Sequence, residues 1–226
     1  MAAVSIRDAE RHSLPLWPLV ERVPFGDWEL RTDPAPDGRL IKRANSCLAL
    51  GAPGVSLQAA ADAVRRFYRD RDRPALVQVE RDSAIEREFA ELGWQVVAGG
   101  DSHFMHADLV GVLARLGDAS EALVEEDGPR VRVMRVVEGV EVGSGRGAVD
   151  DDWFALHALS VEPAYRRQGH ARALLAALLR WGAARSASVA WLHVETDNAA
   201  ALALYDGLGF TTHHSCRYLR APDDGA

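Results

Sequence analysis

A strand, a loop rich in arginine and glycine, and an amphipathic helix follow one another over residues 156–175, LHALSVEPAYRRQGHARALL. Apolar residues alternate up to Val161, Pro163 ends the strand, and leucines recur at helical spacing from Leu174 onward. The first-turn amides of such a helix have no partner inside it and point outward. With the helix dipole and the neighbouring arginines, they form a site for an anion.

The composition of this loop predicts a diphosphate as the anion. Gly169 lets the backbone approach a phosphate closely, Ala171 leaves the next turn clear, and Arg166, Arg167 and Arg172 add positive charge. The loop is neither a P-loop nor a Gly-x-Gly-x-x-Gly dinucleotide loop, because the glycines and the Lys-Ser/Thr pair of those motifs are missing.

Periodicity predicts an α/β chain on both sides of this segment. The expected strands cover residues 28–32, 39–50, 75–79, 94–97, 102–108, 131–137, 140–149, 153–161, 189–194 and 215–219. The expected helices cover residues 56–68, 85–92, 169–184 and 198–208. A turn is expected at 33–38, and a hairpin turn at Glu138-Gly139.

The two halves of the chain share one pattern of strand, helix, glycine and aromatic strand. Val79 precedes Gly93 by 14 residues, and Val194 precedes Gly209 by 15. This indicates two copies of one α/β unit, although helix–glycine–strand is also a common motif that can recur by chance. We therefore expect an N-terminal domain at 1–116, an acidic linker at 117–128 and a second domain at 129–226.

Composition excludes several classes of function. The net charge is −7, from 26 basic and 33 acidic residues, which argues against nucleic acid as a partner. No apolar run approaches the roughly 18 residues of a membrane span, and charges near the N-terminus argue against a signal peptide, so we expect a cytoplasmic protein. Cys47 and Cys216 lack metal-type spacing, so no metal is expected.

Residues 166–171, RRQGHA, resemble the Arg/Gln-x-x-Gly-x-Gly/Ala loop of the GNAT N-acetyltransferase superfamily. A Leu-x-Val-x-Pro strand end precedes the loop, and residues 198–210, NAAALALYDGLGF, are similar to the Asn-x-x-Ala-x-x-Leu-Tyr-x-x-x-Gly-Phe ending of that family. The resemblance covers residues 130–220. It implies a GNAT fold, a mixed central sheet flanked by helices, and acetyl-CoA as the acyl donor. The shared pattern of the halves then suggests two GNAT-like units in tandem.

The resemblance also implies roles for individual residues. Main-chain groups would hold the pantetheine arm, loop amides would hold the diphosphate, and Asn198 would lie near the thiol. Tyr205 would protonate the departing thiolate. The alternatives are that Asn198 is only a helix N-cap and that Tyr205 only packs in the core. The implied acetyl-CoA-binding residues are Leu159, Ser160, Val161, Arg166, Arg167, Gln168, Gly169, His170, Ala171, Arg172 and Asn198.

His157 is the candidate base, because an ammonium must lose a proton before it can attack a thioester. The segment around His157 resembles that of arylalkylamine N-acetyltransferases, but Ala155 stands where those enzymes have a second histidine. Strand alternation would place His157 on the face of Leu159 and Val161, so a core histidine is the competing interpretation. Asp150–Asp152 could neutralise a cationic substrate, or could form a solvated turn.

The first half has a degenerate loop at residues 50–56, LGAPGVS, without an arginine pair, so one active site per chain is expected. The leading hypothesis is transfer of an acetyl group from acetyl-CoA to a primary amine by direct attack in a ternary complex. A small-molecule amine is the expected acceptor, and the oligomeric state is left open. The alternatives are a non-catalytic acyl-CoA-binding module, or a GNAT protein that acts on a protein N-terminus or lysine.

Overall fold

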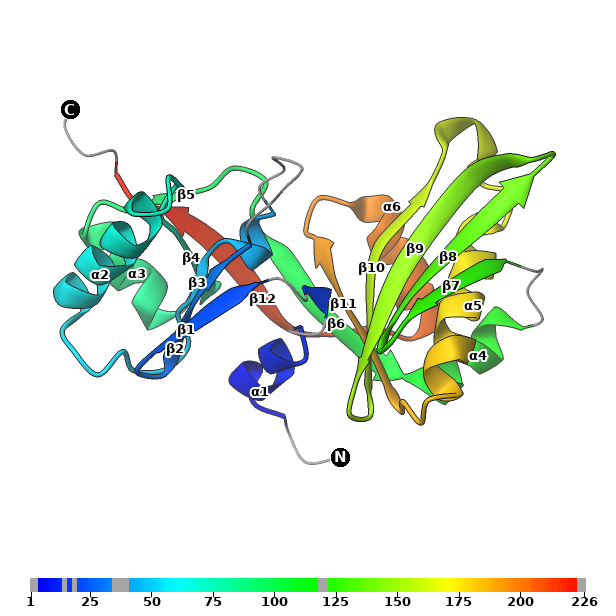
Figure 1. Ribbon diagram of the computed structural model, residues 1–226, viewed down its shortest axis with the longest axis horizontal. Helices are drawn as coiled ribbons and strands as arrows, with labels where there is room; N and C mark the ends of the chain where they lie inside the picture. The colour runs from blue at the N-terminus through cyan, green and yellow to red at the C-terminus, as the bar shows by residue number, and fades with distance from the viewer. Residues whose placement is uncertain (1–3, 14–15, 18–19, 34–40, 118–121, 223–226) are drawn as a thin grey trace. The chain divides into compact units, whose positions relative to one another are not determined.

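The computed structural model describes residues 4–13, 16–17, 20–33, 41–117 and 122–222 (Figure 1). The chain separates into two compact units. Unit 1 consists of Met1–Leu16 and Phe104–His213, and unit 2 of Trp17–His103 and His214–Ala226. The boundaries fall inside strands β6 (Ser102–Asp108) and β12 (Thr211–Arg220).

Each half of the sequence gives its last strand to the other unit. Strand β6 neighbours β11 in unit 1, and β12 pairs with β4 in unit 2. Because of this exchange, the compact units differ from the expected sequential division into 1–116, 117–128 and 129–226. The acidic segment 117–128 also differs from a linker, since its residues Leu123–Asp127 form strand β7 and pair with β8.

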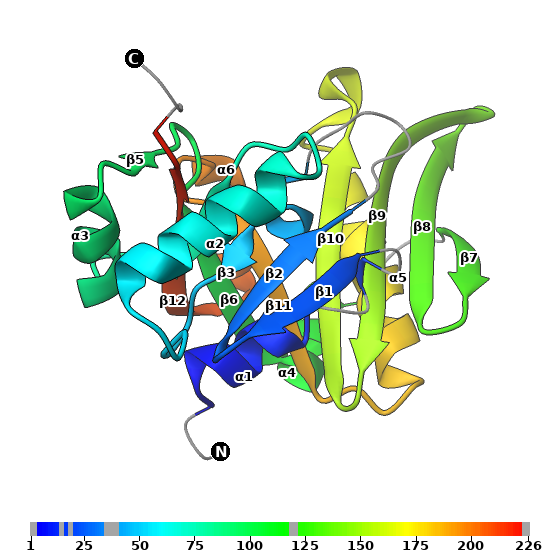
Figure 2. The same ribbon diagram turned by 60° about the vertical axis from the view of Figure 1, so that its left-hand side comes forward.

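Unit 1 is a mixed sheet in the order β6-β11-β10-β9-β8-β7, with helix α5 across one face of β8, β9 and β10 (Figure 2). Helix α5 exists because Leu174, Leu175, Leu178 and Leu179 form one apolar stripe, and all four are fully buried in the core of this unit. The elements of unit 1, besides β6 and β12, are α1 (Ile6–Arg11), α4 (Leu109–Leu116), β7, β8 (Arg130–Val137), β9 (Val140–Asp150), β10 (Trp153–Val161), the 3-10 turn η3 (Pro163–Tyr165), α5 (His170–Ala183), β11 (Val189–Glu195) and α6 (Ala199–Leu208).

Unit 2 is a sheet in the order β1-β2-β3-β4-β12, with β5 also paired to β12. Residues from helices α2 and α3 pack with Trp28, Phe89 and Trp94 in a second core. The elements of unit 2, besides the shared strands, are β1 (Glu21–Phe25), β2 (Trp28–Thr32), the 3-10 turn η2 (Lys42–Ala44), β3 (Cys47–Leu48), α2 (Leu57–Arg69), β4 (Leu76–Glu80), α3 (Ala84–Glu91) and β5 (Gln95–Val96).

The expected helices form within one residue or so of their predicted bounds, because their caps are encoded locally. Ser56 and Ser83 accept backbone hydrogen bonds at the starts of α2 and α3. Gly209 ends α6 with φ +90°, a left-handed conformation that favours glycine. The hairpin of β8 and β9 turns at Glu138-Gly139, as expected.

One expected strand and one expected turn have other outcomes. The long strand at 39–50 is wrong, because only Cys47 and Leu48 pair with β2. The side chain of Asn45 donates from Nδ2 to the carbonyl of Ile41 and accepts at Oδ1 from the backbone amide of Asp33. Such local side-chain bonds compete with the hydrogen bonds of a sheet ladder. Instead, β2 forms its hairpin with β1, which was not predicted. The expected turn at 33–38 lies outside the described residues from position 34 onward. Among the described residues, no helix has the length and apolarity needed to cross a membrane.

Unit 2 contains a partly buried ion-pair network around Arg217 of β12. Arg217 donates to Asp101 from Nε at 2.9 Å and from Nη2 at 2.6 Å, and to Glu86 from Nη1 at 2.6 Å. The hydrogen bond from Arg217 holds the pKa of Asp101 below its ordinary value. A carboxylate with a depressed pKa in the folded state stabilises the fold above its unfolded pKa, and this stabilisation disappears as the pH falls through the folded pKa.

We therefore expect Asp101→Asn to lower the free energy of unfolding by about 1–3 kcal/mol at pH 7. The difference from the wild type should shrink below about pH 4, where the unfolded carboxyl protonates, and vanish below the folded pKa. Urea unfolding at a series of pH values measures it. Asp82→Asn is the control, because the Asp82 side chain is 79% exposed and should change stability little. A difference that stays constant across the series would contradict this account.

Candidate functional site

Helix α5 begins with an uncapped N-terminus at the sequence-predicted anion loop. Gly169 is the N-cap with φ +84° and makes no side-chain cap bond, and among the described side chains none of the hydrogen bonds identified goes to a first-turn amide. A Cβ at Gly169 would meet nothing within 4 Å, so the space beside this turn is open. The amides of His170, Ala171 and Arg172 are therefore available to an external acceptor, and a negatively charged one is favoured by the dipole of the 14-residue helix.

The polar side chains of the loop hold its shape. Arg166 Nε donates to the carbonyl of Val161 at 3.0 Å, and Gln168 Nε2 donates to the carbonyl of Ala164 at 3.3 Å. Arg172 Nη2 donates to the last-turn carbonyl of Arg115 in α4 at 2.7 Å. Arg167 is exposed with φ +61°. The phosphate contacts predicted for these side chains stay predictions.

Strands β10 and β11 are parallel neighbours that separate part-way along their length. Their pairing runs from Trp153↔Val189 to Leu156↔Leu192 and goes no further in these described strands. Beyond Leu156, β10 still pairs with β9, and Ser160 and Val161 lie opposite Ser144 and Gly143. On the edge of β10 that faces away from β9, the main-chain groups of residues 157–161 are therefore not paired with β11. These include Leu159, Ser160 and Val161, the residues expected to hold an extended ligand.

A bulge in β10 moves His157 away from its expected face. Ala158 has φ +53°, and the register with β9 shifts between His157 and Ser160. Leu156 is in the core, and Leu159 and Val161 pack against that same core. His157 directly follows Leu156 and lies on the opposite face. The expectation that His157 shares a face with Leu159 and Val161 is therefore wrong, because the bulge interrupts the alternation on which it depended.

Tyr205 lies on α6, 7% exposed, with its ring edge-on to Phe210 at 5.5 Å between centroids. Burial raises the pKa of its phenol to about 12. Among the described residues, none hydrogen-bonds its hydroxyl. The side chain is therefore a neutral phenol, able to donate a proton over the whole physiological pH range.

Asn198 is the N-cap of α6, and its Oδ1 accepts from the amide of Ala201 at 3.1 Å. Since this bond satisfies a first-turn amide, we expect Asn198→Ala to lower the free energy of unfolding by about 0.5–2 kcal/mol. Asn198→Ser should restore most of it, because serine also caps. Thermal unfolding with and without acetyl-CoA measures both effects. A lost acetyl-CoA shift in the well-capped serine variant would mean that Asn198 also contacts the ligand.

A family model described as "Probable histone acetyltransferase Rv0428c C-terminal" matches residues 3–219, nearly the whole chain. The chain belongs to this family. The relative of that name from Mycobacterium tuberculosis H37Rv is 29% identical over 236 residues, covering 98% of this chain and 76% of its own. The [Ribosomal protein bS18]-alanine N-acetyltransferase of Escherichia coli K12 is 46% identical over 59 residues, and the match spans only 40% of that enzyme.

Solved structures show that this member of the Rv0428c C-terminal family has a GNAT fold. A GCN5-related N-acetyltransferase from Kribbella flavida superposes with TM-score 0.76 at 15% identity, over 99% of this chain and 98% of that one. A tandem GNAT protein from the clavulanic acid biosynthesis pathway superposes with TM-score 0.66 at 14% identity, over 100% and 91%. The expected GNAT superfamily membership and the expected fold class are confirmed.

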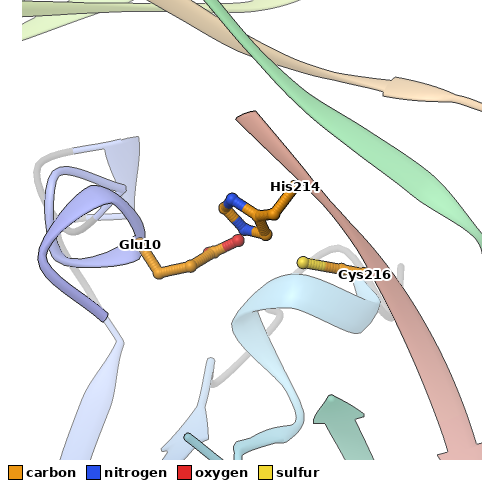
Figure 3. A group of neighbouring side chains, drawn as sticks. All are labelled: Glu10, His214 and Cys216. Carbon is orange, nitrogen blue, oxygen red and sulfur yellow. The ribbon is translucent and has the colours of Figure 1, made fainter. Parts of the chain in front are cut away.

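Sequence reasoning missed a buried pair in this family member, Glu10 of α1 with His193 of β11. His193 Nε2 lies 3.2 Å from Glu10 Oε1, with side chains 2% and 0% exposed. Figure 3 shows Glu10 projecting from α1. The two other residues labelled there, His214 and Cys216, belong to the part of β12 that lies in unit 2. His193 directly follows Leu192, as His157 follows Leu156, so both histidines stand on the sheet face opposite the core where the strands separate. The alternation from Trp191 to His193 was the available signal.

Two of the three aspartates before β10, Asp150 and Asp152, have partners inside unit 1. His12 Nδ1 lies 2.8 Å from Asp150 Oδ2, and the His12 ring stacks on Trp153 at 4.5 Å. Asp152 Oδ2 accepts from Ser188 Oγ at 2.7 Å. These contacts attach α1 and the start of β11 to the sheet, which favours a structural role for Asp150 and Asp152 over charge neutralisation.

Proposed function

We propose that this protein transfers an acetyl group from acetyl-CoA to a primary amine by direct attack in a ternary complex. The observation that carries the proposal is the uncapped start of α5 at Gly169, which follows a strand that has separated from its parallel neighbour. A helix start without a side-chain cap and a main-chain edge unpaired with β11 therefore occur together in unit 1. Membership of an acetyltransferase family and the GNAT fold support the same conclusion.

The residues present fit acetyl-CoA, because the open space at Gly169 leaves room for a diphosphate in front of the α5 amides. The main-chain groups of Leu159, Ser160 and Val161 would hold the pantetheine arm in the manner of an added strand. Asn198, exposed at the start of α6, would lie near the thiol end. When bound, acetyl-CoA supplies an acyl group activated as a thioester.

The chain's own residues would manage the protons. His157 would accept a proton from the ammonium of the acceptor, since a neutral imidazole can do so near pH 7. Its placement away from the apolar core, at the bulge of β10, supports this role. The Tyr205 hydroxyl would supply a proton to the sulfur that leaves. Neither Cys47 nor Cys216 lies in the motif, so no covalent relay is part of the proposal.

For the acceptor, we propose a small-molecule amine or a protein amine, because the relatives' names include a mycothiol acetyltransferase as well as acetyltransferases of proteins. One relative is named for a ribosomal-protein alanine and another for a histone. The decisive experiment is a screen of amino acids, polyamines, aminosugars and peptides, with release of free CoA as the readout. Release that depends on one class of amine supports the proposal. Stabilisation by acetyl-CoA without release for any amine would instead indicate a non-catalytic acyl-CoA-binding module.

His157→Ala should lower kcat/KM by about 10²-fold or more near pH 7, because the ammonium then loses its proton to solvent alone. The rate of the variant should rise steadily with pH as free amine becomes available. A pH–rate profile with the best acceptor measures this. An alanine variant with the wild-type profile would remove His157 from the reaction. His103→Ala, in unit 2, is the matched control.

A further inference from the structure

Unit 2 buries an arginine inside a polar cluster that the proposed acetyl transfer does not use. Arg31, on β2, is only 2% exposed. Its guanidinium donates to Gln78 Oε1 at 2.8 Å, to the carbonyl of Ser46 at 3.3 Å and to Ser46 Oγ at 3.4 Å. All of these acceptors are neutral, and Ser46 and Gln78 are both fully buried. The burial of a cation is costly unless an anion accompanies it.

The hydrogen bonds that the Arg31 guanidinium makes to Gln78 and Ser46 do not include a carboxylate. Among the described residues, no carboxylate pairs with Arg31. Glu29, two positions away on the same strand, pairs with Arg22. Burial raises the pKa of the Cys47 thiol to about 12 and that of the Tyr68 phenol still further, so both stay neutral. Within the part of unit 2 that the structure describes, the positive charge of Arg31 therefore has no carboxylate paired with it.

A second buried donor lies in the same cluster. Gln78 Nε2 has no hydrogen-bond partner among the described residues, although the side chain is 0% exposed. The amide cannot turn round to improve this, because Gln78 Oε1 already accepts from Arg31 and from the hydroxyl of Tyr218 at 3.3 Å. A buried donor without an acceptor is costly, and native proteins retain few of them.

These side chains gather on one face of the unit 2 sheet. Gln78 is opposite Tyr218 in the ladder between β4 and β12, and opposite Leu48 in the ladder between β3 and β4. Val77 and Val79 point into the core beneath helices α2 and α3, so Gln78 points to the other face. The cluster is thus separate from the apolar core and lies across neighbouring strands.

We propose that Arg31 and Gln78 form a binding site for the carboxylate of a small-molecule ligand. One carboxylate oxygen would accept from the Arg31 guanidinium and the other from Gln78 Nε2, which satisfies both groups at once. The single negative charge matches the single buried cation, whereas a phosphate dianion would leave an excess charge in a buried place. The site belongs to unit 2 and does not depend on acetyl transfer by unit 1.

The test compares carboxylates with neutral isosteres in thermal unfolding of the full chain. Propionate and benzoate should raise the wild-type Tm by about 2 °C or more at 100 mM, relative to sodium chloride of equal ionic strength. Propionamide and benzamide should not. The rise should be lost in Arg31→Met and kept in Arg87→Met, which removes an exposed arginine of α3. Equal stabilisation by amides or by inorganic phosphate, or no stabilisation by any carboxylate, would overturn the proposal.

A second variant keeps the proposal testable if Arg31→Met fails to fold. Gln78→Glu places a carboxylate beside Arg31 within the chain itself, with almost no change of shape. We expect its Tm without ligand to exceed that of the wild type by a few degrees, and the further rise with propionate to disappear. A lower Tm for Gln78→Glu would show that Arg31 needs no anion, and the proposal would then be wrong.

Discussion

Gly169→Asp should abolish the stabilisation that acetyl-CoA gives to the wild type and lower kcat/KM by more than about 10²-fold. Two physical effects act together at this position. The φ of +84° is a conformation that residues with a Cβ rarely adopt, so the start of α5 would distort. The new carboxylate would also occupy the open space beside the amides of His170 and Ala171, where it would compete with a diphosphate.

The control for Gly169→Asp is Gly128→Asp, in the turn between β7 and β8. Gly128 also has a positive φ, +57°, and open space where a Cβ would lie, so the variant matches both the backbone strain and the added charge. Thermal unfolding with and without acetyl-CoA, followed by titration calorimetry, compares the two. We expect Gly128→Asp to keep the acetyl-CoA shift at a lower starting Tm. Should both variants keep the shift, the start of α5 is not the binding site.

The sequence predicted the local structure of the site well because each piece is specified by neighbouring residues. Pro163 ends β10, Gly169 provides the left-handed N-cap, and the leucines of α5 define the buried face. The N-cap role of Asn198 was also foreseen as one of two interpretations. Such features depend on backbone preferences within a few residues, which one sequence is sufficient to reveal.

Features that depend on partners distant in sequence were missed. Strand β6 ends the first half of the sequence but neighbours β11 of unit 1, and β12 ends the second half but pairs with β4 of unit 2. No residue near either strand indicates this exchange. Glu10 and His193 are 183 positions apart, and Arg31 and Gln78 are 47 apart, so their pairing needs the fold. The bulge at Ala158 was hidden for another reason: alanine gives no signal of a positive φ, and alternation therefore placed His157 on the wrong face.

Tyr205→Phe should lower kcat by about 10²-fold or more, with little change in the stabilisation by acetyl-CoA. The substitution removes only a hydroxyl that no described residue bonds, so the fold should keep its stability within about 1 kcal/mol. Because burial raises the phenol pKa to about 12, the wild-type rate should show no loss of this acid below about pH 11. A fall in the wild-type rate as the pH rises towards 11 would therefore not come from ionisation of Tyr205.

Thioesters with different leaving thiols distinguish an acid from a packing residue. A proton from Tyr205 matters most when the leaving thiolate is strongly basic and least when it is a stable anion. The ratio of wild-type to Tyr205→Phe turnover should therefore fall towards 1 for acetyl thioesters of pantetheine analogues with more acidic thiols. A packing defect would lower the rate with every donor by the same factor. A constant ratio across the series, or wild-type turnover in the variant, would exclude Tyr205 as the proton donor.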